Sequence, residues 1–342
     1  MAFGLRSLVP DCVAHFQSPK AEVQRPARES AIGNCKSKMS KGVHRFAVLV
    51  ACATFFLIIA GANVTSHDAG LATSDWPLSN GQFFPRMVGN LFWEHGHRLV
   101  ATAVGILTIA LAIYLQFSER RIWIKRLGWI ALLGVIAQGL LGGLTVKMNL
   151  PLAVSAAHAT LAQLFFLTTV SLAVFTSRSW TIAESTVRED GEGVSVRALC
   201  IVALTVILAQ LVLGATLRHS ATWDEELPAG LLWAHIGGAL IVTLVVGITV
   251  LTVLMRHRGE KYLARPALFA AALLAGQLLL GLAAYITRTM SPEDPQPLNP
   301  MISVTVAHVA GGALVFATMI ILTLRLFRVL RLDRQEYVLA PA

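Results

Sequence analysis

The chain contains few charged residues for its length. Of its 342 residues only 14% are Asp, Glu, Lys or Arg, while 55% are hydrophobic. A soluble domain carries about a quarter charged residues. Together with a mean hydropathy of +0.66, this shortage of charge excludes an ordinary soluble protein. It favours a membrane protein over the two soluble domains that length alone suggests.

Cysteine is also scarce, and the four cysteines form no recognisable motif. Cys12 and Cys35 lie in the polar N-terminal segment, and Cys52 and Cys200 lie in apolar runs. The chain has no CxxC pair, no haem-attachment CxxCH and no zinc-binding spacing. We therefore expect neither a covalently attached haem nor a structural disulfide.

The first 43 residues lack an apolar core long enough for a cleavable signal peptide. They are rich in Arg, Lys and Ser and poor in aromatic residues. We interpret residues 1–43 as a disordered cytoplasmic tail. A mitochondrial transit peptide is the alternative, because a basic composition that includes serine is typical of that class as well.

Long apolar runs, in contrast, are abundant. A helix of about 20 apolar residues crosses the roughly 30 Å of hydrocarbon in a bilayer. Eight such runs occur, at about 44–64, 91–117, 126–146, 152–176, 198–217, 229–255, 265–287 and 301–327. The sequence therefore predicts an all-α membrane protein with eight transmembrane helices.

The basic residues indicate one orientation of these helices. The N-terminal segment through Arg45, the C-terminal segment from Arg325, and the loops 118–126, 177–197 and 256–265 contain 23 of the 28 Lys and Arg residues. By the positive-inside rule both termini are cytoplasmic, or in the matrix of a mitochondrion, and an even number of spans agrees with that. The formal charge of +9 thus reflects topology and suits anionic lipid. It is no indication of nucleic-acid binding.

The odd-numbered spans end with a shared pattern on the outer side. In three of them a glutamine precedes a glycine by four residues, and the first span has Leu57 and Gly61 in these places. The pairs are Gln138 and Gly142, Gln210 and Gly214, and Gln277 and Gly281. Residues four apart share a helix face. Glycine permits close approach and glutamine can hydrogen-bond across helices, so ordinary helix packing also accounts for the pattern.

The even-numbered spans each carry one histidine about six or seven residues from their outer end, roughly 10 Å deep. These are His97, His158, His235 and His308. The repeat predicts that a four-helix unit is duplicated, so that residues 44–176 and 198–327 form two tandem four-helix bundles with pseudo-two-fold symmetry. Residues 177–197 would be a cytoplasmic linker and 328–342 a cytoplasmic tail.

Four histidines at one depth predict haem binding. An ionisable residue inside a span is costly and is therefore a functional candidate, although a single one can be an ordinary hydrogen-bonded core residue. Two facing imidazoles in each bundle can ligate one haem iron from both sides. Zinc prefers four protein ligands, whereas haem supplies four nitrogens of its own. The glycines after the last two histidines leave room for a ring edge (Gly237, Gly238, Gly311 and Gly312).

Only the first half carries an acid beside its histidine. Glu94 and His97 are three residues apart and share a helix face, so the carboxylate can lie over the same pocket. The plainer explanation for Glu94 is that the helix dipole stabilises a negative charge at the start of the helix. His95 lies about 200° around the helix from His97 and cannot point into the same pocket. The long outer loop before this helix contains turn residues at Asn80-Gly81 and can form a lid or platform.

With these histidines and Glu94, the chain resembles haem A synthase, a membrane enzyme that converts haem O to haem A for cytochrome oxidase. The resemblance covers about residues 44–327. It depends on DWPLSNGQ (75–82), EHGHR (94–98), GGLTV with LP and AAHATLAQ (142–163), AHIGGA (234–239) and AHVAGGA (307–313). Each piece is weak alone, but their order and spacing together are specific.

The resemblance implies a role for each candidate residue. His97 and His158 would flank the substrate, haem O, and His235 and His308 would ligate a resident haem b. Glu94 would be the catalytic carboxylate and would transfer protons. The enzyme would be an oxidoreductase that converts a ring methyl of haem O to a formyl group by successive hydroxylations and loss of water.

The resemblance also implies a setting for the enzyme. It would lie in the bacterial cell (inner) membrane, or in the mitochondrial inner membrane as the alternative. Its partners would be the lipid bilayer, an electron donor and haem O, delivered by haem O synthase. A homo-oligomer remains an option.

One departure from the family concerns cysteine. Many bacterial members have a cysteine pair in the first outer loop, where this chain has Thr73 and Ser79. That disulfide cannot form here, which puts a thiol-based redox role in doubt.

Two other functions compete with the synthase. A bis-haem b-type cytochrome that carries electrons explains the histidines but gives no role to Glu94 or the long loop. A transporter or haem-delivery factor would be expected to have helices broken near the midplane, and the sequence indicates none.

Overall fold

The computed structural model describes residues 25–183, 187–188, 194–221, 225–289, 297 and 299–331. Within these residues the chain is almost entirely helical. Eight helices are long and apolar enough to cross a membrane, which confirms the predicted number. They are α1 (Arg25–Ser66), α2 (Asn90–Ser118), α3 (Ile122–Lys147), α4 (Leu152–Thr176), α6 (Val196–His219), α7 (Ala229–His257), α8 (Lys261–Thr289) and α9 (Asn299–Val329).

The observed ends of the other seven spanning helices lie within a few residues of the predicted ones, but α1 differs. Its apolar span is Lys41–Ser66, whereas its backbone is helical from Arg25. Ala, Arg and Lys are good helix formers, so a helix can continue beyond the part that hydropathy detects. Residues 1–24 of the predicted tail lie outside the described residues.

The predicted linker 177–197 contains regular structure that hydropathy did not reveal. A short helix, α5 (Arg178–Ile182), follows α4 directly. Strand β1 (Val187–Arg188) then pairs in parallel with β2 (Leu330–Arg331), which follows α9. Two-residue strands have no periodicity to detect, because their pairing depends on residues far away in the chain.

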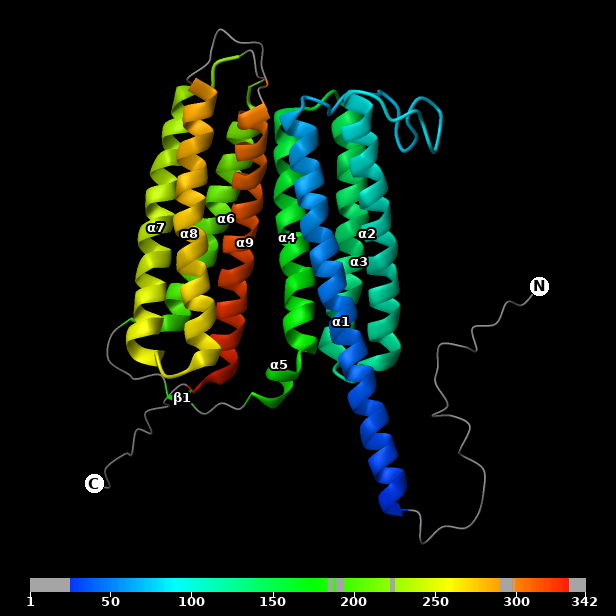
Figure 1. Ribbon diagram of the computed structural model, residues 1–342, viewed down its shortest axis with the longest axis vertical. Helices are drawn as coiled ribbons and strands as arrows, with labels where there is room; N and C mark the ends of the chain where they lie inside the picture. Colours follow the sequence, from blue (N-terminus) through cyan, green and yellow to red (C-terminus); the bar gives the residue numbers. More distant parts are fainter. Residues whose placement is uncertain are drawn as a thin grey trace, which may run out of the picture.

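The helices form two groups that stand side by side (Figure 1), with α1–α4 in one and α6–α9 in the other. Each group has its own apolar core. The first includes Leu111, Leu115 and Leu172, and the second includes Met319 and Leu322.

A third apolar cluster connects the two groups of helices. Ala51 and Ile58 of α1, Phe166 of α4, and Ala313 and Ala317 of α9 belong to it. The groups therefore contact each other through α1, α4, α6 and α9.

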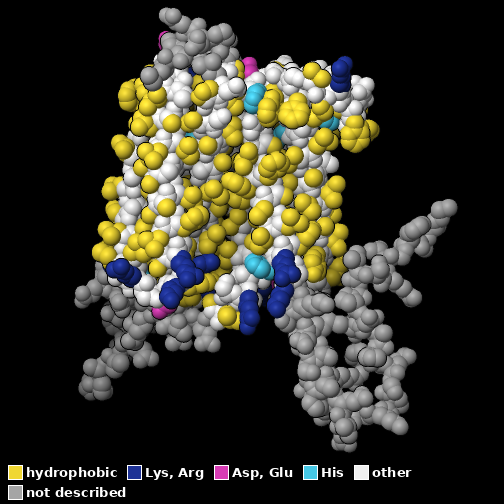
Figure 2. Space-filling view, viewed as in Figure 1, with side chains coloured by type: hydrophobic (Ala, Val, Ile, Leu, Met, Phe, Trp, Pro, Cys, Tyr) yellow, Lys and Arg dark blue, Asp and Glu magenta, His cyan; other side chains and the backbone are white. Residues whose placement is uncertain are grey.

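The surface has the pattern of a multi-pass membrane protein. Large apolar side chains point outward along the spans, for example Ile106, Leu240 and Leu279, each more than 60% exposed. Figure 2 shows hydrophobic atoms along the flank and Lys and Arg side chains gathered at the end where α5 lies. Exposed apolar residues at this density are stable only in contact with lipid or another protein.

Candidate functional site

Each of the four candidate histidines packs on a glycine of the preceding helix. A Cβ atom added to that glycine would lie closer to the imidazole than ordinary van der Waals contact, which begins at 3.4 Å. The distances from the ideal Cβ position to the histidine Cε1 are 3.1 Å for Gly61 and His97, 2.9 Å for Gly142 and His158, 2.9 Å for Gly214 and His235, and 3.0 Å for Gly281 and His308. The repeated glycines and the repeated histidines of the sequence therefore contact each other, and this contact occurs four times.

The glutamine one turn before the glycine contacts the same histidine in three of the four cases. The amide nitrogen of Gln210 donates to the carbonyl oxygen of His235 over 2.8 Å and lies 3.0 Å from its Nδ1. The amide nitrogen of Gln138 donates to the carbonyl oxygen of His158 over 3.0 Å, and that of Gln277 lies 3.1 Å from Nδ1 of His308. These glutamines orient the imidazoles, as outer-sphere partners do for metal-binding histidines.

His97 has no such partner, because α1 carries Leu57 where the other helices carry glutamine. Its Nδ1 atom is buried and has no hydrogen-bond partner among the described residues. Its ring orientation is therefore less constrained than those of His158, His235 and His308.

The glycines that follow the last two histidines do not have the role that we expected. The amide oxygen of Gln210 occupies the space beside Gly238, and that of Gln277 occupies the space beside Gly311. The room predicted for a ring edge at these two positions is therefore filled by glutamine. Only Gly237 has open space where its side chain would be.

His235 and His308 face each other in the second helix group. Their ring centroids are 6.3 Å apart and the ring planes are inclined by 77°. A metal–imidazole bond is about 2 Å long, and the ring centre lies roughly 1 Å behind the nitrogen, so two imidazoles on one metal have centroids about 6 Å apart. The separation in this structure therefore fits two axial ligands of one iron.

His97 and His158 belong to the first helix group, each packed on its glycine. Several buried polar atoms of this group have no hydrogen-bond partner among the described residues. These are Nδ1 of both histidines, Oγ of Ser155, and Oε1 of Gln138 and Gln163. Buried polar atoms are normally paired, so this group of helices offers unmet hydrogen-bonding capacity to a polar ligand.

A bare metal ion does not fit these histidine pairs. No group of three or more His, Cys, Asp or Glu that could hold an ion occurs within the described part of the chain. Two imidazoles suffice only where a macrocycle supplies the other ligands.

Glu94 lies at the top of α2 and points to the outer loop. It is 4% exposed. One carboxylate oxygen pairs with the guanidinium of Arg98, and the other accepts a hydrogen bond from the backbone N–H of Thr73 over 3.0 Å. Neither oxygen forms a hydrogen bond with His97 or His158 within the described residues, so the carboxylate anchors the loop in this structure.

Arg98 extends this anchor, and we did not single it out from the sequence. Its guanidinium also donates to the carbonyl oxygens of Asp75 and Leu78, over 3.0 and 2.6 Å. The signal that could have identified it is the spacing of Glu94 and Arg98, since residues four apart on a helix pair readily.

His95 also belongs to the loop contact, and its side chain does not contact His97. Its Nδ1 atom lies 2.9 Å from Oγ of Ser79, which is fully buried. Thr73 and Ser79 thus hydrogen-bond to Glu94 and His95, and these two bonds hold the loop against α2.

The loop itself closes as a hairpin at the predicted turn. Ser79 and Gln82 exchange two backbone hydrogen bonds of 3.0 and 3.1 Å around Asn80 and Gly81. Both turn residues have positive φ, 52° and 69°, as the two-residue hairpin turn requires.

Asp75 stabilises this turn from inside the loop. Its carboxylate accepts hydrogen bonds from the backbone N–H of Gly81 over 2.8 Å, from the hydroxyl of Thr73 and from the N–H of Asn80 over 2.9 Å. These donors hold the pKa of Asp75 well below its usual range.

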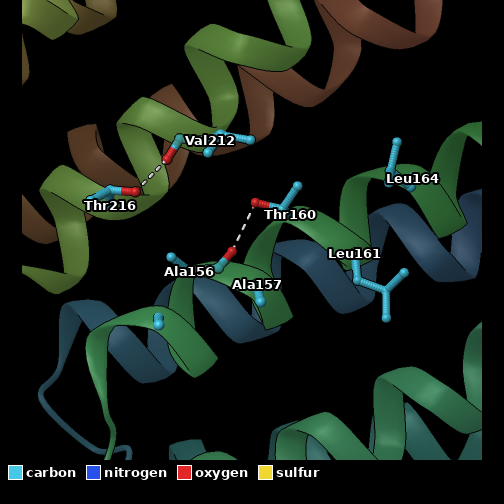
Figure 3. A pocket seen from close by; sticks show the side chains of 8 residues that line it. Ala156, Ala157, Thr160, Leu161, Leu164, Val212 and Thr216 are labelled. Atoms are coloured by element: carbon cyan, nitrogen blue, oxygen red, sulfur yellow. Dashed lines mark hydrogen bonds between the residues drawn. The ribbon is translucent and has the colours of Figure 1, made fainter.

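A separate groove lies between the helix groups, with α4 on one side and α6 on the other (Figure 3). It has a volume of about 460 Å³, and its walls include Ala156, Ala157, Thr160, Val212 and Thr216. Both threonine hydroxyls bond back to carbonyl oxygens of their own helices. The groove is therefore apolar, and the candidate histidines do not line it.

Comparisons with known proteins find haem A synthases among the proteins similar to this chain. A model of the cytochrome oxidase assembly protein family matches residues 87–223. The heme A synthase of Bacillus licheniformis is 26% identical over 186 residues, 54% of this chain and 61% of that protein. The heme A synthase of Symbiobacterium thermophilum is 29% identical over 248 residues, 66% of this chain and 79% of that protein.

Other matches are shorter. The heme A synthase of a Caulobacter species is 32% identical over 133 residues, 35% of this chain and 39% of that protein. A protoheme IX farnesyltransferase of Haloarcula marismortui is 45% identical over 65 residues, but these are 18% of this chain and 13% of that protein. The chain thus spans less than two thirds of the Bacillus and Caulobacter relatives. The matches confirm the resemblance to haem A synthases that the sequence motifs indicate.

Proposed function

We propose, on the basis of this confirmed resemblance, that the chain is a haem A synthase, an oxidoreductase of haem A biosynthesis that acts on haem O. The observation that carries the proposal is the fourfold contact of a histidine with a glycine on the preceding helix. This arrangement makes two imidazole pairs inside the membrane, which suits two haem-type molecules. A bis-haem electron-transfer cytochrome would need the same pairs, but the curated relatives described above favour the synthase.

We propose that the second helix group holds haem b, with His235 and His308 as its axial ligands. The centroid distance of 6.3 Å suits this role, and Gln210 and Gln277 hold the imidazoles in place. When bound, the haem supplies one-electron transfer, while axial ligands and their hydrogen bonds adjust its potential.

We propose that haem O lies between His97 and His158 in the first helix group. The unpaired polar atoms there suit a molecule with polar substituents. The freedom of His97, which has no glutamine partner, suits a substrate that must enter and leave. The overall change would convert one ring methyl into a formyl group: two hydroxylations, each taking one oxygen atom from an external oxidant, would give a geminal diol that loses water.

We propose Glu94 as the carboxylate that handles protons in this reaction. Its contacts with Arg98 and Thr73 hold it at the mouth of the first helix group, on the helix that carries His97. Because the same contacts anchor the loop, an experiment on Glu94 needs a readout of loop structure beside the readout of activity.

We propose that both helix groups are four-helix bundles of a duplicated unit, with residues 44–176 and 198–327 as the two halves and both termini in the cytoplasm. The gathering of Lys and Arg near α5 supports this orientation under the positive-inside rule. A bacterial inner membrane is the proposed location, since the relatives named heme A synthase above are bacterial. The match to a protoheme IX farnesyltransferase supports haem O synthase as the supplier of the substrate, and an electron donor is also required.

The test is extraction and chromatography of the haems from the purified protein, expressed with a supply of haem O. Wild type should contain haem b and haem A. Glu94→Gln should accumulate haem O or a hydroxylated intermediate and should lose less loop resistance to proteolysis than Arg98→Gln, because the glutamine oxygen can still accept from the N–H of Thr73. Two equivalents of haem b, with no O- or A-type haem in any variant, would indicate the bis-haem cytochrome instead.

Arg98→Gln is the matched control, because it breaks the same ion pair and leaves the carboxylate in place. If Glu94→Gln and Arg98→Gln lose activity and loop protection to the same extent, Glu94 is an anchor of the loop and not a catalytic residue.

A further inference from the structure

A second cavity lies on the basic side of the molecule, where the two helix groups are joined. It has a volume of about 370 Å³ and is lined by Arg121 before α3, Trp123 of α3, Trp180 and Thr181 of α5, and Arg328 near the end of α9. In Figure 1, α5 lies below and between the two groups. The cavity therefore receives side chains from the first group, the connection and the second group.

The aromatic wall of this cavity is firmly packed. The ring of Phe175 lies edge-on to both tryptophans, with centroid distances of 4.7 Å to Trp123 and 4.8 Å to Trp180. Such edge-to-face pairs are favourable beyond the area that they bury. The two indoles are thus held at the end of the spans, where tryptophan is enriched in membrane proteins because its ring suits the headgroup region.

The two arginines of the cavity differ in how their charge is balanced. Arg121 forms an ion pair with Glu119, with its Nη2 atom 2.8 Å from the carboxylate. Arg328 donates only from Nε, to the carbonyl oxygen of Trp180 over 3.3 Å, and its guanidinium lies 5.7 Å from the centre of that indole. Its two terminal nitrogens have no hydrogen-bond partner, and no carboxylate pairs with it, within the described part of the chain.

We propose that this cavity binds the phosphate headgroup of an anionic phospholipid, with Arg328 as the residue that pairs with the phosphate. A guanidinium with both terminal nitrogens available matches phosphate geometry. Basic pockets between helices on the cytoplasmic side recognise anionic headgroups. The cavity also lies at the level where headgroups are found, since α3 and α9 leave the apolar region there.

The bound lipid would stabilise the packing of the two helix groups against each other. It would contact Trp123 of the first group, Trp180 of the connection and Arg328 of the second, and so add a link at the end where β1 and β2 also pair. This role concerns assembly of the scaffold and does not depend on the reaction that the protein catalyses.

Thermal unfolding of the full-length protein in detergent tests this proposal, with phosphatidylglycerol, phosphatidylcholine or inorganic phosphate added. Phosphatidylglycerol should raise the midpoint for wild type, and the other two should not. Arg328→Gln should weaken the apparent affinity for phosphatidylglycerol about fivefold, the effect of one basic residue at a membrane surface, and Arg328→Lys should weaken it less. Arg265→Gln, an exposed arginine of α8 outside the cavity, is the control and should behave as wild type.

Three outcomes would overturn the proposal. Equal effects of Arg328→Gln and Arg265→Gln would show that only overall charge matters. An equal response to inorganic phosphate would indicate a site for a free anion. Loss of stability in Arg328→Gln that is the same with and without lipid would indicate that Arg328 pairs with the chain itself. Because Arg328→Lys retains the charge, it keeps the test decisive if Arg328→Gln fails to fold.

Discussion

Replacing Gly214 with alanine should displace His235 and weaken the haem b binding that we propose for the second helix group. The added Cβ would lie 2.9 Å from Cε1 of His235, while ordinary van der Waals contact begins at 3.4 Å. The imidazole must therefore move by about 0.5 Å or the helices must separate, and overpacking of this kind costs about 1–3 kcal/mol. That range corresponds to about 5- to 150-fold weaker haem retention.

The assay is the ratio of haem to protein after purification, together with the low-spin spectrum of bis-histidine ligation. Gly237→Ala is the matched control, because its Cβ meets no atom within 4 Å although it is only two residues from His235. Gly61→Ala, whose Cβ would lie 3.1 Å from His97, should affect the first site less. Normal haem content and spectrum in Gly214→Ala would refute the idea that the glycine is required for the position of the histidine.

Three further predictions follow from other contacts. Gln210→Leu should retain the fold but lower haem affinity about 10- to 100-fold, as loss of an outer-sphere partner of a metal-binding histidine does. Haem titration of the purified protein measures this, and unchanged affinity would mean that the amide does not orient His235. Gly143→Ala should loosen the outer loop, since its Cβ would lie 2.6 Å from the indole of Trp76; faster proteolysis of the loop with unchanged haem content in the second group is the expected result. The hydrogen bonds to Asp75 should stabilise the loop above about pH 4, the usual pKa of an aspartate, and this stabilisation should be lost as the pH falls toward the lower pKa of the folded loop. The protection of the loop amides against hydrogen exchange, taken relative to the intrinsic exchange rate at each pH, should therefore fall below about pH 4 in wild type, while Asp75→Asn should be weakly protected at every pH.

Much of the fold could be predicted because its signals are local. Apolar runs of span length revealed the eight spanning helices, since each must satisfy its own backbone hydrogen bonds within the membrane. The turn at Asn80 and Gly81 was predictable for a similar reason, because the residue types alone favour positive φ. The helical backbone of α1 before residue 41 and the β1–β2 pair were not predicted, because neither carries an apolar period.

The site was predictable only in part. Repetition of glycine and histidine at matched positions identified the four histidines without any knowledge of their contacts. The role of Glu94 could not be decided in this way, since its spacing from His97 is as favourable as its spacing from Arg98. The structure shows the carboxylate paired with Arg98 and with the backbone of Thr73.

The sequence by itself determined the membrane spans, their number and the positions that repeat, because hydropathy and helical spacing act over a few turns of one helix. Only the tertiary structure decided which glycine lies against which histidine, where the glutamine amides fit, and that Arg328 and Trp180 meet at the junction of the two helix groups. These contacts join residues on different helices, and their geometry depends on how closely the helices approach, which no single segment specifies.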